Sequence, residues 1–223
     1  DSGMNEGSWT VLGAYSNCHT IGIEPQPQCI PPAKMALEHN RLSARIVNAL
    51  LAPTPTTAII DVSKPCFGGL QPNELGRAKS AGRRAHVGSL RLDELDEFKD
   101  PNAYVALWHL DVEGAEIPVL RSAAKLFAQH RINRVMFEIT FKRWDQFGIH
   151  SKQEGLEELR RRFQGWTCTW ACNGRPFPWT PVSRHQVYCA RPWNEHSDLG
   201  WGLFDVFCVA PGMPPVWNAT GSR

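Results

Sequence analysis

Short apolar segments typical of strands alternate with helix-forming segments along the first two-thirds of the chain. Strand, helix and strand in repeated succession predict an α/β fold with a mainly parallel central sheet. Right-handed crossovers then place helices on both faces of that sheet, as a three-layer sandwich. The expected strands are 19–24, 44–52, 56–63, 85–92, 104–111 and 132–140. One expected helix begins near Ser8, and the others span 31–42, 93–98, 116–129 and 151–164.

Size and charge exclude several classes of protein. The chain has 223 residues, which at about 150 residues per domain predicts one domain over 1–223. Lys and Arg total 24 and Asp and Glu total 22, so the net charge of +2 gives no basic field for nucleic acid. No apolar run approaches the roughly 20 residues of a membrane span. We therefore expect no nucleic-acid partner and no membrane span.

The last third of the chain has a different character, because seven of the nine tryptophans lie at or beyond Trp144. Strands are expected at 166–172 and 203–210, with an irregular Trp-rich insertion at about 173–202 and a loose tail at about 211–223. Aromatic rings stack well on sugars and flat apolar ligands, so the insertion could form an acceptor pocket. A cap over a small sheet explains the same residues equally well.

The opening residues form a glycine-rich loop that starts with an acid. Gly3 and Gly7 permit a tight turn and close approach of a ligand to the backbone, and a helix follows. Glu24 ends the next strand, 21 residues after Gly3, where an acid can accept hydrogen bonds from ribose hydroxyls. The pattern favours a nucleoside site, although a surface turn followed by a strand-end glutamate would look the same.

A second acidic cluster, Asp111, Glu113 and Glu116, follows the expected strand 104–111. Ligands in open α/β sheets bind beyond the carboxyl ends of the strands, where acids have a reason to exist. Glu113 and Glu116 could instead complement the dipole of the first helical turn. Asp111, on the strand itself, is harder to explain that way.

These clusters and four further motifs occur in one order over residues 1–140 and resemble the FkbM family of S-adenosylmethionine-dependent methyltransferases. The matching segments are Asp1-Ser2-Gly3-Met4-Asn5-Glu6-Gly7-Ser8-Trp9-Thr10, Ile23-Glu24-Pro25-Gln26-Pro27, Val47-Asn48-Ala49, Leu90-Arg91-Leu92-Asp93-Glu94-Leu95, His109-Leu110-Asp111-Val112-Glu113-Gly114-Ala115-Glu116 and Phe137-Glu138-Ile139. Met4 and His109 depart from the residues usual in the family. The resemblance implies a class I, Rossmann-like fold.

The resemblance also implies residue roles around the cofactor, S-adenosylmethionine. The cofactor-binding residues would be Asp1, Gly3, Asn5, Gly7, Glu24, Asn48, Ala49 and Asp111. Within this set the loop residues would line the methionine portion, Glu24 would bind the ribose, and Asn48 and Ala49 would lie near the adenine. Asp111 would face the transferred methyl group.

The family methylates hydroxyls of glycans or small metabolites, so such an acceptor is expected here. Methyl transfer needs alignment above all, and an oxygen nucleophile also needs its proton taken. Asp111, Glu113 and His109 are the expected catalytic residues, with Glu138 as a further candidate base. Paired acids could hold a divalent ion, but we expect no metal. The main alternative is a non-catalytic binding module that retains the cofactor fold. A nucleotide-sugar or NAD-linked enzyme is a third possibility, which the missing third glycine of the opening loop disfavours.

The sequence opens at Asp1, which the resemblance puts at the end of a first, central strand that the chain lacks. We expect upstream residues to supply that strand. The default compartment is the cytoplasm, with the secretory lumen as the alternative if an upstream segment carries a signal or an anchor.

The chain has seven cysteines, of which Cys168, Cys172, Cys189 and Cys208 come late. A zinc site with His185 or His196 is conceivable, but the cysteine spacing is not that of a tight pair. We expect buried or free thiols, because cysteine packs well in apolar strands. Disulfides would require a secretory compartment.

Overall fold

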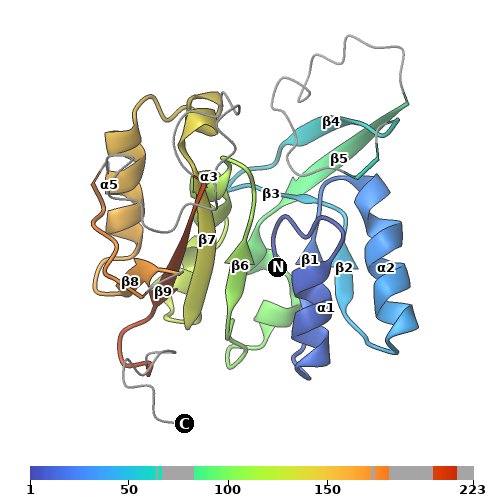
Figure 1. Ribbon diagram of the computed structural model, residues 1–223, viewed down its shortest axis with the longest axis horizontal. Helices are drawn as coiled ribbons and strands as arrows, with labels where there is room; N and C mark the ends of the chain where they lie inside the picture. The colour runs from blue at the N-terminus through green and yellow to red at the C-terminus, as the bar shows by residue number, and fades with distance from the viewer. Residues whose placement is uncertain (64, 67–82, 172–173, 181–202, 215–223) are drawn as a thin grey trace.

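The computed structural model describes residues 1–63, 65–66, 83–171, 174–180 and 203–214 (Figure 1). The N-terminal half contains α1 (Ser8–Tyr15), β1 (Ile21–Ile23), η1 (Pro27–Cys29), α2 (Ile30–His39), β2 (Arg45–Val47), β3 (Leu50–Leu51), β4 (Thr57–Asp61), β5 (Arg84–Leu90), η3 (Leu92–Glu94) and η4 (Asp96–Lys99). The C-terminal half contains β6 (Trp108–Leu110), α3 (Glu116–Arg121), α4 (Ala124–Ala128), β7 (Arg134–Thr140), η5 (Phe141–Phe147), α5 (Lys152–Arg162), β8 (Thr167–Trp170) and β9 (Leu203–Val209).

The opening residues join the two halves of the main sheet. Ser2 forms parallel bridges with Ile23, at the end of β1, and with Leu110, at the end of β6. The parallel members therefore run in the order β2, β1, Ser2, β6, β7, which is the order of a doubly wound Rossmann sheet. The Rossmann-like α/β fold expected from the sequence is confirmed. The switch point of the sheet lies between Ser2 and β6, so the next residues, Gly3 and Asp111, begin the crevice.

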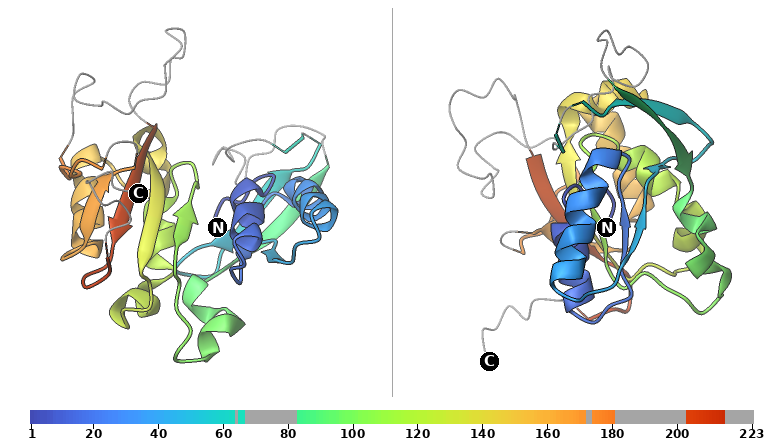
Figure 2. Two further views of the ribbon diagram at one scale, coloured as in Figure 1. Left: turned by 60° about the horizontal axis from the view of Figure 1, so that its bottom comes forward. Right: turned by 90° about the vertical axis from the view of Figure 1, so that its right-hand side faces the viewer.

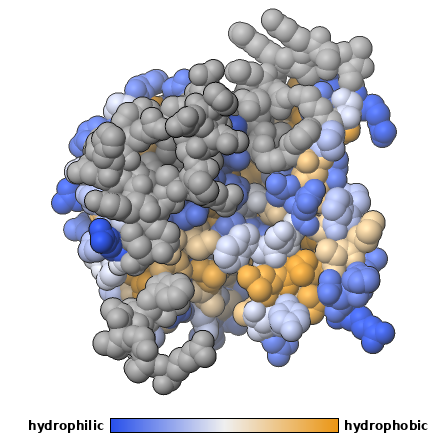
Figure 3. Space-filling view, in the orientation of Figure 1, coloured by the Kyte–Doolittle hydropathy of each residue, from blue (hydrophilic) through white to orange (hydrophobic). Residues whose placement is uncertain are grey.

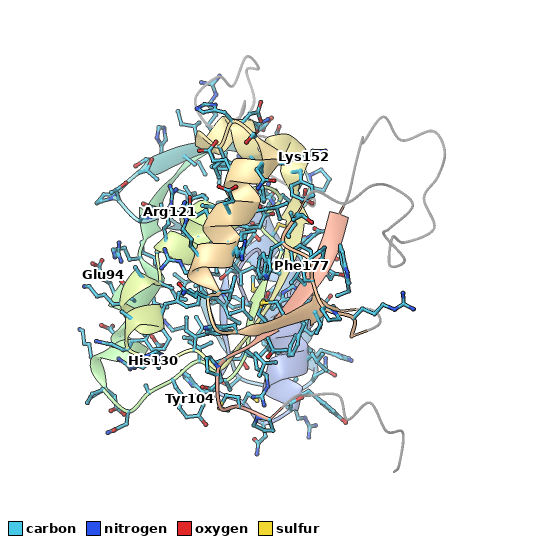
Figure 4. The ribbon with its side chains drawn as sticks, turned by 90° about the vertical axis from the view of Figure 1, so that its left-hand side faces the viewer. Glu94, Tyr104, Arg121, His130, Lys152 and Phe177 are labelled. Atoms are coloured by element: carbon cyan, nitrogen blue, oxygen red, sulfur yellow. A yellow bond between two sulfur atoms is a disulfide. The ribbon has the colours of Figure 1, made fainter. Side chains whose placement is uncertain are left out.

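The far edge of the main sheet is antiparallel. β9 lies between β7 and β8 and pairs antiparallel with both, so the sheet ends in the order β6, β7, β9, β8. The strands expected at 166–172 and 203–210 are thus present with shorter bounds. The described start of the Trp-rich insertion packs here: Phe177, labelled in Figure 4, meets Trp170 edge-on. Trp179 stacks on Phe163 of the turn after α5. The remainder of the insertion, from 181 to 202, and the end of the tail lie outside the described residues.

A second, smaller sheet stands beside the first (Figure 1). β3 pairs parallel with β5, and β5 pairs antiparallel with β4, around a small core of Ala58, Ile60 and Val87. The single strand expected at 44–52 is wrong, because the chain divides there. Its first half joins the main sheet as β2, and its second half joins the small sheet as β3.

Helices flank the main sheet. α1 and the η3–η4 segment lie on opposite sides of β1 and β2 (Figure 2). The helix expected at 116–129 divides into α3 and α4, and α3 is tied to α5 by Arg121, whose Nε donates to Oε1 of Glu158 at 2.7 Å.

A hydrophobic patch covers the outer face of α1, where Trp9 and Leu12 are exposed (Figure 3). None of the helices in the described ranges has the length and hydrophobicity needed to cross a membrane.

Two disulfides correct the expectation of unpaired thiols. Cys168 and Cys208 face each other directly in the β8–β9 register, and Cys29 at the end of η1 is bonded to Cys66 after β4. Among the described cysteines only Cys18 is free, and it is exposed. Spacing along the sequence could not reveal either pair, because the partners are 40 and 37 residues apart and meet only in the folded chain.

Candidate functional site

A cavity of about 460 Å³ lies at the switch point of the main sheet. Its volume is within the range of roughly 300–1,000 Å³ that is usual for small-molecule sites. The lining comes from the opening loop, the end of β1, the small sheet, the loop after β6 and the end of η5. The lining includes Gly3, Asn5, Glu24, Ala49, Asp111, Glu113, Gln146 and Phe147.

Gly3 brings the two sides of the crevice into contact. A Cβ atom at Gly3 would lie only 1.7 Å from the carbonyl oxygen of Asp111, and its φ of +75° is a conformation that side chains rarely adopt. The opening loop can therefore pack on the end of β6 only with glycine at this position. Gly7 has a different role, because it makes room for Ala33 of α2, and the described cavity lining does not include it.

Glu24 is held with its carboxylate ready to accept further hydrogen bonds. The side chain is 3% exposed; Oε2 accepts from the backbone N–H of Asn5 at 2.8 Å, and Oε1 accepts from that of Gln26 at 2.9 Å. Burial raises the pKa of Glu24, and these two hydrogen bonds, together with one from the Gln26 side chain, oppose that shift. An ionised carboxylate has about four lone-pair directions, so acceptor capacity remains for ligand hydroxyls.

Three carboxylates meet at the other end of the crevice. One oxygen each from Asp111, Glu113 and Glu138 lies within 4.8 Å of the others. Burial, followed by the charge of Asp111 beside it, raises the pKa of Glu138 to about 9. Oε2 of Glu113 lies 3.0 Å from Nη1 of Arg143, so the two opposite charges form an ion pair. Such a group can share a proton, and its spacing would also admit a divalent cation.

His109 is bound to the opening loop and α1. Its Nδ1 is 3.0 Å from Oδ1 of Asp1, and Trp9 of α1 stacks on its ring with centroids 4.5 Å apart. Thr10 donates a hydrogen bond to the other carboxylate oxygen of Asp1 at 2.7 Å. Burial lowers the pKa of His109 to about 4, so the ring is neutral at physiological pH. Among the residues that the structure describes, neither His109 nor Asp1 lines the cavity.

The two residues expected near an adenine have different roles. Ala49 is buried and lines the cavity. Asn48 is exposed, and its Nδ2 donates to the carbonyl oxygens of Glu24 and Pro25 at 2.8 and 3.0 Å. Asn48 therefore ties the end of β2 to the end of β1, which fixes the backbone that carries Glu24.

Glu116 is outside the described cavity lining but supports it, and the sequence did not reveal this role. It begins α3 but is 0% exposed; Oε1 accepts from the N–H of Gly114 at 2.9 Å, and Oε2 accepts from Nε1 of Trp144 at 2.7 Å. Burial raises the pKa of Glu116 to about 7. The side chain joins the loop after β6 to η5, so it is more than a complement to the helix dipole.

The end of η5 was also missed. Gln146 and Phe147 line the cavity and face it from the same short segment as Arg143. This segment lies in the region of general similarity beyond residue 140, where no motif marked it. The close packing of Gly114 against Arg143, where a Cβ would lie 2.4 Å from the arginine Cβ, helps to fix its place at the crevice, together with the Glu113–Arg143 and Glu116–Trp144 contacts.

Fold and cavity together define a Rossmann-like α/β protein with a ligand crevice at the carboxyl ends of its strands. A family model described as the Methyltransferase FkbM domain matches residues 1–167, so the chain belongs to the FkbM methyltransferase family. Among curated proteins, none matches the chain. A solved structure titled "Human methyltransferase 10 domain containing protein" is similar, with 14% sequence identity over 94% of this chain and 69% of that chain and a TM-score of 0.45.

Proposed function

We propose that this methyltransferase uses S-adenosylmethionine and methylates a hydroxyl oxygen of a glycan or small metabolite. The observation that carries the proposal is the carboxylate of Glu24, buried at the end of β1 with unused acceptor capacity in a cavity that Asp111 also lines. An acid in this position suits the ribose hydroxyls of a nucleoside. The family match supports the same cofactor.

The residues around the cavity fit the cofactor in size and in chemistry. Gly3 and Asn5 would face its methionine portion, Glu24 its ribose, and Ala49 its adenine. Asn48 and Gly7 act indirectly, since one fixes the backbone at Glu24 and the other lets α2 pack against the loop. When bound, S-adenosylmethionine supplies an electrophilic methyl group on a positively charged sulfur.

Asp111 is the residue that we assign as general base. It lines the cavity, whereas His109 is turned toward Asp1 and Glu113 is neutralised by Arg143. Asp111 would accept the proton of the acceptor hydroxyl as the oxygen bonds to the methyl carbon. A positioned base of this kind typically contributes about 10²- to 10⁴-fold to the rate.

Calorimetric titration with S-adenosylmethionine, S-adenosylhomocysteine and NAD tests the cofactor. We expect one site per chain for the first two ligands and no binding of NAD. Transfer of labelled methyl groups to a panel of glycans and hydroxylated metabolites then tests the acceptor class. Labelling confined to protein, nucleic acid or amine acceptors would contradict it, and cofactor binding without any transfer would favour a non-catalytic binding module.

The two disulfides support a further part of the proposal, an oxidising compartment. Such bonds persist in secreted and lumenal proteins and are rare in the cytosol of mesophiles. We therefore place the protein in the secretory lumen or outside the cell in preference to the cytoplasm. Mass spectrometry of the protein isolated from its source under alkylating conditions should find Cys29 and Cys208 oxidised, and free thiols at both would contradict this placement.

A further inference from the structure

The Cys29–Cys66 disulfide joins η1, which directly follows the cavity-lining residue Gln26, to the chain after β4. Cys29 ends η1, is 0% exposed, and directly precedes α2, while Cys66 follows β4 and is half-buried. A second link accompanies the bond, because Nε2 of Gln28 donates to the carbonyl oxygen of Asp61 at 3.4 Å. The chain after β4 is thereby fastened to the start of α2.

The disulfide also touches the loop that lines the cavity. Oδ1 of Asn5 lies 2.7 Å from Sγ of Cys66 and 4.0 Å from Sγ of Cys29. Asn5 has a φ of +52°, an uncommon backbone conformation for a residue other than glycine. Its N–H is one of the two donors that hold the carboxylate of Glu24. Contact therefore runs from the disulfide through Asn5 to Glu24.

We propose that the Cys29–Cys66 disulfide positions Asn5 for cofactor binding, so that its reduction weakens the affinity for the cofactor. The inference rests on the proposed function, because it takes the cavity as the cofactor site. A bonded Cys66 holds its sulfur against the Asn5 side chain, which limits the positions open to that side chain. Once the bond is broken, Cys66 is no longer held beside Asn5 although the Gln28–Asp61 link remains, and ordering Asn5 becomes a cost of binding.

The chemistry of reduction is ordinary thiol–disulfide exchange with a dithiol reductant. Its thiolate attacks Sγ of Cys66, which is the more accessible sulfur, and the sulfur of Cys29 leaves as a thiolate and takes up a proton. The second thiol of the reductant then displaces Cys66 from the mixed disulfide. The reductant ends as a disulfide, and the protein ends with two thiols.

Two double variants test the proposal in the full chain. The double variant Cys29→Ser/Cys66→Ser lacks the disulfide beside Asn5. The control double variant Cys168→Ser/Cys208→Ser lacks the disulfide between β8 and β9, which lie at the edge of the main sheet far from β1. Both variants should lower the melting temperature, because each loses a crosslink. Only the first should bind S-adenosylhomocysteine about tenfold more weakly than the oxidised wild type.

Linkage provides a readout that a merely structural crosslink would not change. If the oxidised chain binds S-adenosylhomocysteine tenfold more tightly, saturating ligand must make Cys29–Cys66 harder to reduce by the same factor. That factor corresponds to a shift of about 30 mV in the midpoint of a dithiothreitol redox titration. Differential alkylation and mass spectrometry of the wild type should show this shift for Cys29 and Cys66, and none for Cys168 and Cys208. This measurement needs no variant, so it stands even if the first double variant does not fold.

Equal affinity of the oxidised and reduced chains, or equal protection of both disulfides by ligand, would overturn this inference and leave the proposed function intact. A failure of the oxidised wild type to bind S-adenosylhomocysteine would overturn the proposed function and this inference together. Weaker binding in both double variants to the same degree would also overturn it, because the effect would then follow from lost stability.

Discussion

Replacing Glu24 tests most of the site in one step. Its carboxylate is buried, accepts two backbone N–H groups, and faces the cavity. Glu24→Ala removes every acceptor that we assign to the ribose. Glu24→Gln keeps the volume and one oxygen, but its NH₂ group must then oppose one of the two backbone donors.

The expected loss of cofactor affinity follows from the hydrogen bonds that each substitution removes. A hydrogen bond to a charged group is worth about 1.5–3 kcal/mol, so Glu24→Ala should weaken S-adenosylmethionine binding by about 10- to 150-fold. Glu24→Gln should lose less, about 3- to 10-fold, since one neutral acceptor remains. Each backbone N–H left unpaired in the buried site should also cost about 1–3 kcal/mol of stability.

The assay is calorimetry with S-adenosylmethionine and S-adenosylhomocysteine, at a temperature well below the melting midpoint of each variant. Both ligands should weaken equally, because both carry the ribose. Glu158→Gln on α5 is the matched control, since its carboxylate pairs with Arg121 away from the cavity, and its affinity should equal that of the wild type. Wild-type affinity in Glu24→Ala would show that the nucleoside assignment of this acid is wrong.

Three further predictions concern catalysis, the loop and pH. Asp111→Asn should reduce the rate of methyl transfer by at least about 100-fold, because the lost carboxylate takes the acceptor proton. Its affinity for S-adenosylhomocysteine should change by less than about threefold. An unchanged rate in the labelled-methyl assay would exclude Asp111 as the base. Gly3→Ala should lower the melting temperature sharply, because its Cβ would lie 1.7 Å from a carbonyl oxygen. The control Gly88→Ala should leave the melting temperature unchanged, because nothing lies within 4 Å of a Cβ there. Equal melting curves for the two variants would contradict the proposed packing at Gly3. Burial raises the pKa of Glu116 to about 7, so the folded chain binds a proton more strongly than the unfolded chain between pH 4.5 and 7, and stability falls as pH rises through that window. Relative to Glu116→Gln, the wild type should lose about 3 kcal/mol of unfolding free energy between pH 4.5 and 7, measured by urea titration. Parallel pH profiles for the two proteins would refute the raised pKa of Glu116.

The sequence predicted those parts of the fold that depend on local pattern. Alternating apolar and helical segments predicted the parallel sheet, and acids at strand ends predicted that Glu24 and Asp111 lie at the crevice. Both follow from residues close together in the chain, because a strand end and the turn after it are local features. The division of 44–52 into β2 and β3 could not be predicted, since both halves read as strand and only tertiary pairing assigns them to different sheets.

Site residues that act through distant partners were the ones missed or misplaced. Glu116 looks like a helix-start acid until Trp144, 28 residues later, is found donating to it. His109 stands in the strongest motif, yet the stacked ring of Trp9 and the carboxylate of Asp1 hold it away from the cavity. The pairing of Cys29 with Cys66 likewise depends on how the chain returns after β4.

A crystal structure of the chain with S-adenosylhomocysteine would test the central claim most directly. We predict the ligand in the cavity at the switch point, with both ribose hydroxyls donating to Glu24 and the sulfur on the side of Asp111. The side-chain oxygen of Asn5 should remain against the Cys29–Cys66 disulfide. A ligand bound elsewhere, or bound in the cavity with its ribose away from Glu24, would contradict the account.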